Sequence, residues 1–114
     1  MTVLVIEDDE LIRDSILNLL SSRGINAIAA VDGRNGLQLA KEIMPELILC
    51  DIRMPGLSGY EVLSNLRQDS RTAQIPLIFL SAEKTLDVNN LGAGYLSKPF
   101  TTAQLLKAIA PYLS

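Results

Sequence analysis

Polar side chains follow four short apolar runs, each at the point where a run ends. The polar residues are Glu7, Asp8, Asp51, Ser81 and Lys98. If the runs are parallel strands, their carboxyl ends meet at one edge of a sheet, which gathers three carboxylates, one hydroxyl and one ammonium group. Crowded carboxylates repel one another, and Mg²⁺, which prefers oxygen ligands, would relieve that repulsion. The residue types therefore indicate a site for a divalent cation and an anionic phosphoryl group.

Each of these residues also has a simpler interpretation. The run Glu7–Glu10 alone is equally well explained as a solvated helix start, where the helix dipole favours acids. Asp51 favours the site, because an acid directly after a fully apolar strand needs a partner, and Lys98 and Ser81 are candidates. Simpler roles would be a solvated lysine for Lys98 and a helix or turn cap for Ser81. Cys50 is interpreted as a small core residue.

The length and composition indicate one domain, residues 1–114, because 114 residues with 48% apolar content supply a single core. The net charge of −3 and the lack of a basic patch argue against direct binding to nucleic acid. No apolar run is long enough to span a membrane. The single cysteine cannot form an internal disulfide, so we expect a cytoplasmic protein. Histidine is absent, which excludes histidine-based catalysis.

The elements that must position these residues alternate along the chain. Strands are predicted over residues 2–7, 25–30, 46–50, 76–80 and 94–97. Helices are predicted after the capping residues Asp9, Asp32, Ser58 and Thr101, and they end near residues 22, 44, 68 and 113. Residues 83–92 have a weak pattern that leaves about two helical turns.

Strands that alternate with helices predict an α/β fold, a doubly wound (flavodoxin-like) sheet of five parallel strands in the order 2-1-3-4-5 with helices on both faces. In this order the crevice lies beyond the first and third strands, where Glu7, Asp8 and Asp51 fall.

Four fragments of the sequence carry a family resemblance: VLVIEDDELIR, LILCDIRMPGLSGYEVL, IPLIFLSA and GAGYLSKPFT. With them, essentially all of the chain resembles the CheY-like receiver domain of two-component response regulators. The resemblance implies a domain that accepts a phosphoryl group from a sensor histidine kinase or a phosphotransfer protein, uses Mg²⁺, and switches conformation to signal to a partner. Such a domain is a signalling module rather than an enzyme, since it catalyses only its own phosphorylation and dephosphorylation.

The resemblance also implies roles at the acidic end of the site. Asp51 is similar to the aspartate that accepts the phosphoryl group. Asp8 would bind Mg²⁺ directly and Glu7 would bind it through water, because the interval from Asp8 to Asp51 matches that of the family. The backbone carbonyl of Arg53 would be a third protein ligand. Arg53 and Glu83, each two positions beyond a site residue, would gate water access to the phosphorylated site.

Further roles implied by the resemblance lie on the other side of the crevice. Lys98 would pair with the phosphoryl oxygens, and the peptide bond between Lys98 and Pro99 would be cis. Ser81 would turn inward to hydrogen-bond the phosphoryl group, and Tyr95 would change rotamer with it, so these two are the expected switch residues.

The interval between Ser81 and Lys98 departs from the family, since it is shorter by more than one helical turn. The shortened region is the family's fourth helix, which belongs to its output face. The sequence leaves open whether this shortening is natural or reflects omitted residues.

Other functions compete with that of a stand-alone receiver. The chain could be the receiver part of a longer regulator or hybrid kinase, and a phosphorylation-dependent dimer is compatible with either. A metabolite phosphatase or phosphotransferase would be expected to have substrate-recognition loops and a second acid two positions after Asp51, where this chain has Arg53. A flavin carrier would want a phosphate loop rich in Ser, Thr and Gly, whereas Glu7–Glu10 is anionic. The sequence does not specify the kinase, the stimulus or the downstream partner.

Overall fold

The computed structural model describes residues 2–82 and 93–113. Within them, five parallel strands form one sheet in the order β2-β1-β3-β4-β5, as predicted. The strands are β1 (Thr2–Ile6), β2 (Asn26–Ala30), β3 (Leu47–Asp51), β4 (Leu77–Ser81) and β5 (Gly94–Ser97). The helices are α1 (Glu10–Ser22), α2 (Gly33–Ile43), α3 (Gly59–Gln68) and α4 (Thr102–Ile109), and a short 3₁₀ helix, η2 (Ala110–Tyr112), follows α4.

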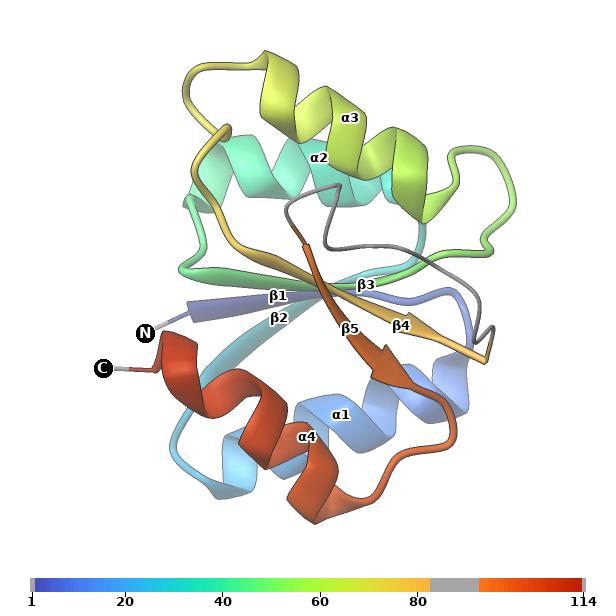
Figure 1. The fold of residues 1–114 in the computed structure, drawn as a ribbon, viewed down its shortest axis with the longest axis vertical. Coiled ribbons are helices and arrows are strands. Elements are labelled where there is room, and N and C mark those ends of the chain that lie inside the picture. Colours follow the sequence, from blue (N-terminus) through green and yellow to red (C-terminus); the bar gives the residue numbers. More distant parts are fainter. Residues whose placement is uncertain (1, 83–92, 114) are drawn as a thin grey trace.

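The sheet lies between two helical layers, with α2 and α3 on one face and α1 and α4 on the other (Figure 1). Every residue of β3 and β4 is buried, which explains why their sequences are almost continuously apolar. One core cluster packs between the sheet and α2 and α3, and a second packs between the sheet and α1 and α4. The central strands that carry the polar residues are therefore fixed from both faces.

The helix starts follow the predicted capping chemistry. The Asp9 carboxylate accepts hydrogen bonds from two backbone N–H groups of α1, and Asp32 accepts one from α2. Ser58 and Thr101 form complete capping boxes at α3 and α4. These local contacts set where each helix begins, and so how each preceding loop leaves the sheet.

Two groups of boundaries differ from the prediction. The last α-helix ends at Ile109 rather than near Leu113, because Pro111 lacks an N–H donor and its ring disrupts the preceding turn, which tightens to 3₁₀. Asp51 and Ser81 are the last residues of β3 and β4, instead of the first residues after them, since each still aligns with a neighbouring strand.

The shortened fourth helix of the family, predicted at 83–92, and Glu83 lie outside the described residues. Among the helices that the structure does describe, none combines the length and the apolar character that crossing a membrane requires.

Candidate phosphoryl-acceptor site

The carboxyl ends of β1 and β3 bring Glu7, Asp8 and Asp51 together. One carboxylate oxygen from each residue lies within 4.8 Å of the others. The pairing of Ile6 with Cys50 aligns the two strand ends, so the acids that follow them fall at the same height. Glu7 is fully buried and Asp51 is 8% exposed, whereas Asp8 is open to solvent. The cluster is therefore anchored in the core and reachable from outside, and its position at one edge of the sheet is the one that the strand pattern predicted.

The Lys98 ammonium lies between two of these acids. Its Nζ is 2.8 Å from Glu7 Oε2 and 3.3 Å from Asp51 Oδ1. The backbone holds it there, because the Lys98 N–H donates to the Ser81 carbonyl at 2.7 Å and the Lys98–Pro99 peptide bond is cis. The expected ammonium group thus lies in the same crevice as the acids.

Burial dominates the electrostatics of the site. It raises the pKa of Glu7 and of Asp51, and the nearby Lys98 only partly offsets this effect. Burial alone would lower the pKa of Lys98, but its hydrogen bond to Glu7 and the charges of Glu7 and Asp51 together raise it. The ammonium is therefore charged at neutral pH. An added cation would further favour the ionised form of the two buried carboxyl groups.

The backbone after Asp51 is held by the start of α3. Asp51 Oδ1 accepts a hydrogen bond from the Ile52 N–H at 2.8 Å. The Gly59 N–H donates to the Ile52 carbonyl at 2.7 Å, and a Cβ atom at Gly59 would collide with the Asp51 carbonyl oxygen. This close approach explains why glycine stands at the first residue of α3. It also fixes the direction in which the chain leaves β3.

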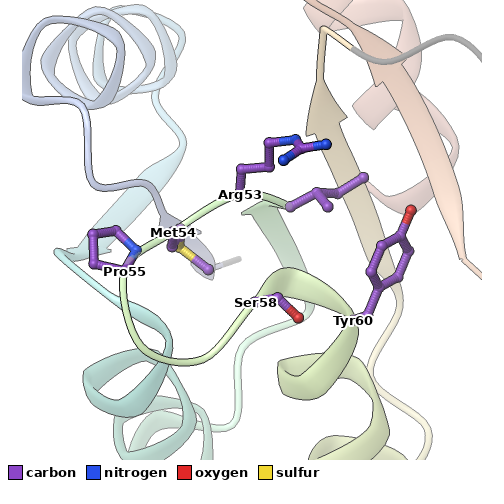
Figure 2. A pocket seen from close by; sticks show the side chains of 6 residues that line it. Arg53, Met54, Pro55, Ser58 and Tyr60 are labelled. Atoms are coloured by element: carbon purple, nitrogen blue, oxygen red, sulfur yellow. The ribbon is translucent and has the colours of Figure 1, made fainter.

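A pocket of about 570 Å³ lies along this loop between β3 and α3 (Figure 2). It is lined by Ile52, Arg53, Met54, Pro55, Ser58 and Tyr60. The Arg53 side chain stands just past the end of β3, two residues after Asp51. Its predicted gating partner Glu83 lies outside the described residues.

Ser81 and Tyr95 come from neighbouring strands and make direct contact. The Tyr95 hydroxyl donates to the Ser81 carbonyl at 3.2 Å, and Ser81 is buried at the end of β4. The same carbonyl accepts the Lys98 N–H. The backbone carbonyl of Ser81 therefore links Lys98, which contacts the acids, with the partly buried ring of Tyr95.

Sequence reasoning missed Arg13. One of its guanidinium nitrogens donates to the backbone carbonyl of Glu7 at 3.1 Å. Arg13 is four residues after the cap Asp9, which places it one helical turn into α1, and this spacing was the available signal. A long side chain at that position can reach back over the turn that carries the acids.

A family model described as the response regulator receiver domain matches residues 3–110. The chain belongs to this family. The receiver is 34% identical to the DNA-binding dual master transcriptional regulator RpaA of Synechocystis, over 97% of this chain and 48% of that protein. It superposes on Vibrio cholerae CheY4 with a TM-score of 0.91 and 30% identity, covering 98% of both chains.

The receiver domain of the sensor histidine kinase PA1611 from Pseudomonas aeruginosa is also similar, with a TM-score of 0.89, 27% identity, and coverage of 97% of this chain and 95% of that one. The PA1611 receiver has a magnesium ion coordinated in its active-site cleft. Our chain spans about half the length of the first curated relatives that it matches. The predicted CheY-like fold and two-component signalling class are confirmed, and they replace the phosphatase and flavin-carrier alternatives.

Proposed function

We propose that this receiver accepts one phosphoryl group on Asp51 in a reaction that requires Mg²⁺, and that the modified domain changes conformation to signal to a partner. The observation that carries the proposal is the position of the Asp51 carboxylate. It lies beside two further carboxylates and 3.3 Å from the Lys98 ammonium, and it is the acid of the cluster that belongs to a strand, as the last residue of β3.

The donor set fits Mg²⁺, which takes oxygen ligands and keeps several waters. Asp8 and Asp51 would ligate it directly, Glu7 would act through water, and the Arg53 backbone carbonyl would complete the protein ligands. When bound, the ion supplies positive charge to the phosphoryl oxygens. The magnesium ion in the PA1611 receiver structure supports this assignment.

The chemistry required of the chain itself is modest. An Asp51 carboxylate oxygen forms a bond to phosphorus as the bond from phosphorus to the donor's histidine nitrogen breaks. No general base is needed, because the nucleophile is the carboxylate, which Lys98 and the Ile52 N–H both stabilise in its ionised form. Lys98 can then pair with the phosphoryl oxygens, where negative charge is greatest.

The switch follows from the added charge and acceptor oxygens of the acyl phosphate. We assign the Ser81 hydroxyl as the donor that turns toward the phosphoryl group and Tyr95 as the side chain that responds. The Tyr95 contact with the Ser81 carbonyl supports this coupling, because a shift of the Ser81 backbone that accompanies the turn would alter that contact.

The proposed partners are a sensor histidine kinase or phosphotransfer protein as donor and a downstream protein as target. We treat residues 1–114 as one cytoplasmic receiver domain that does not itself contact nucleic acid and that catalyses only its own phosphorylation and dephosphorylation. Relatives about twice as long, and a receiver from the hybrid histidine kinase CckA, support its use within larger regulators, and a phosphorylation-dependent dimer would be one form of output.

Incubation with acetyl phosphate and Mg²⁺ followed by intact mass measurement tests the proposal. Wild-type protein should gain the mass of one phosphoryl group, and EDTA should prevent the gain. The Asp8→Ala variant should lose the Mg²⁺-dependent gain while keeping the fold, whereas Asp14→Ala, which removes an exposed acid from α1, should behave like wild type. Equal gains in all three proteins would overturn the assignment of the metal site.

A further inference from the structure

Asp8 is the site acid with the least support of its own. Its side chain is exposed, and within residues 2–82 and 93–113 its carboxylate takes part in no hydrogen bond or ion pair. Glu7 is held by Lys98, and Asp51 is held by Lys98 and the Ile52 N–H. The position of the Asp8 carboxylate therefore depends on the backbone that carries it.

That backbone is held at three points around Glu7. The Glu7 N–H donates to the Ala30 carbonyl at 3.2 Å, which extends the pairing of β1 with β2. The Asp9 N–H donates to Glu7 Oε1 at 3.2 Å. The Arg13 guanidinium donates to the Glu7 carbonyl at 3.1 Å. Only the first and third contacts are independent of the Glu7 carboxylate, which belongs to the proposed metal site.

The Arg13 contact acts directly on Asp8, because the Glu7 carbonyl and the Asp8 nitrogen belong to one planar peptide unit. Fixing that carbonyl fixes the orientation of the plane from which Asp8 starts. Arg13 is partly buried, and among the described residues it forms no ion pair, so its guanidinium is directed to the Glu7 carbonyl instead of a carboxylate. Its own backbone is anchored by a hydrogen bond to the Asp9 carbonyl at 2.9 Å.

We propose that Arg13 is a positioning residue of the metal centre, which orients the Glu7–Asp8 peptide so that Asp8 is preorganised beside Asp51. This inference rests on the proposed function. Removal of Arg13 has two opposed effects on Mg²⁺ affinity. Loss of the positive charge would strengthen binding of the cation, whereas loss of the hydrogen bond to the Glu7 carbonyl would weaken it. We expect the anchoring effect to be the larger one, and the direction in which Mg²⁺ affinity changes in Arg13→Met decides between the two.

The test is calorimetric titration of Mg²⁺ into metal-free wild-type protein and three variants, together with hydrogen exchange of the backbone amides of the turn. Arg13→Met keeps the aliphatic stem and removes the donor and the charge. Arg13→Lys keeps the charge and one donor group. Arg23→Met is the matched control, because it removes an exposed arginine just past the other end of α1.

Arg13→Met should weaken Mg²⁺ binding about threefold to tenfold, the range of one net hydrogen bond, and should speed exchange at Asp8 and Asp9. Arg13→Lys should recover most of the affinity, and Arg23→Met should match wild type. The inference is overturned if Arg13→Met binds Mg²⁺ as tightly as wild type or more tightly, or if it binds more weakly without faster exchange. It is also overturned if Arg13→Lys recovers no affinity, or if Arg23→Met loses as much affinity as Arg13→Met. If wild-type protein does not bind Mg²⁺, the proposed function itself fails. If wild-type protein binds Mg²⁺ and Arg13→Met binds it equally well, only the role of Arg13 fails.

Discussion

Glu7 and Lys98 form the shortest charge contact in the site, at 2.8 Å. The pair satisfies the ammonium, but it leaves two buried carboxylates, those of Glu7 and Asp51, sharing one lysine beside the exposed Asp8. Partial compensation of this kind is costly for folding, because a buried charge that lacks a full set of partners is destabilising. The arrangement suits binding of a cation and a phosphoryl group better than it suits stability, as is usual for functional sites.

The first prediction concerns the pH dependence of the metal-free protein. Burial raises the pKa of Glu7 above its ordinary value of 4.5, so the folded protein holds this proton to higher pH than the unfolded chain does. The free energy of unfolding that Glu7 contributes is therefore fully present below pH 4.5 and is lost as the pH rises through the folded-state pKa. Urea unfolding at a series of pH values in EDTA should show that loss in wild type and a smaller one in Glu7→Gln. Identical pH profiles of the free energy of unfolding in the two proteins would contradict a raised pKa of Glu7 in the folded state.

A second prediction concerns the gate at Arg53. Its side chain stands where the chain leaves β3, two residues after the proposed acceptor Asp51, and we expect it to restrict the water that must approach in line with the acyl phosphate bond. Arg53→Ala should change the dephosphorylation rate several-fold and the free energy of unfolding by about 0–1 kcal/mol, as expected for an exposed charge. Glu83→Ala should act similarly, and the double variant should show coupling. Decay at the wild-type rate in both single variants would exclude the gate.

At the scale of elements, what the sequence could predict depended on how local the chemistry is. Helix starts were predictable because each cap, such as Asp9 or Ser58, contacts backbone within three residues of itself. The end of α4 was misplaced because the apolar pattern continues to Leu113, whereas Pro111 stops the α-helical hydrogen bonding earlier.

The acidic cluster was predictable from strand order alone, since it needs only the alignment of strand ends. The contacts of Arg13 with the Glu7 carbonyl and of Tyr95 with the Ser81 carbonyl were not, because each depends on the tertiary packing that directs a long side chain.

The third prediction concerns the junction of β3 and α3. A Cβ atom on Gly59 would collide with the Asp51 carbonyl oxygen, and backbone cannot yield as a flexible side chain can. Gly59→Ala should therefore lower the free energy of unfolding by about 1–3 kcal/mol and slow phosphorylation by acetyl phosphate, because Asp51, the proposed acceptor, would be displaced. Chemical denaturation and phosphorylation kinetics measure the two effects. Ser64→Ala, on the exposed side of the same helix, is the control. Wild-type stability and rate in Gly59→Ala would show that the contact is not restrictive.

At the scale of the whole molecule, the site lies where the sheet order turns from β1 to β3, and both helical layers fix the strands that carry it. Binding at this point must stabilise the entire fold, since a ligand that binds only the folded state lowers its free energy.

The fourth prediction is therefore that Mg²⁺ raises the free energy of unfolding, by about 2.7 kcal/mol at a concentration about one hundred times its dissociation constant. EDTA should reverse the change. Thermal or urea unfolding with increasing Mg²⁺ measures it, with Asp14→Ala as the control for loss of an acid. Equal stabilisation of Asp8→Ala would contradict the site, because that variant lacks the proposed direct ligand.

The central claim is that Asp51 is the phospho-acceptor, and chemical trapping tests it most directly. Borohydride reduces an aspartyl phosphate to homoserine, which peptide mass spectrometry locates in the chain. After incubation with acetyl phosphate and Mg²⁺, we predict homoserine in place of Asp51, dependent on Mg²⁺ and absent from the Asp51→Asn variant. Homoserine at another acid of the cluster, or a phosphorylated protein with unmodified Asp51, would contradict the account.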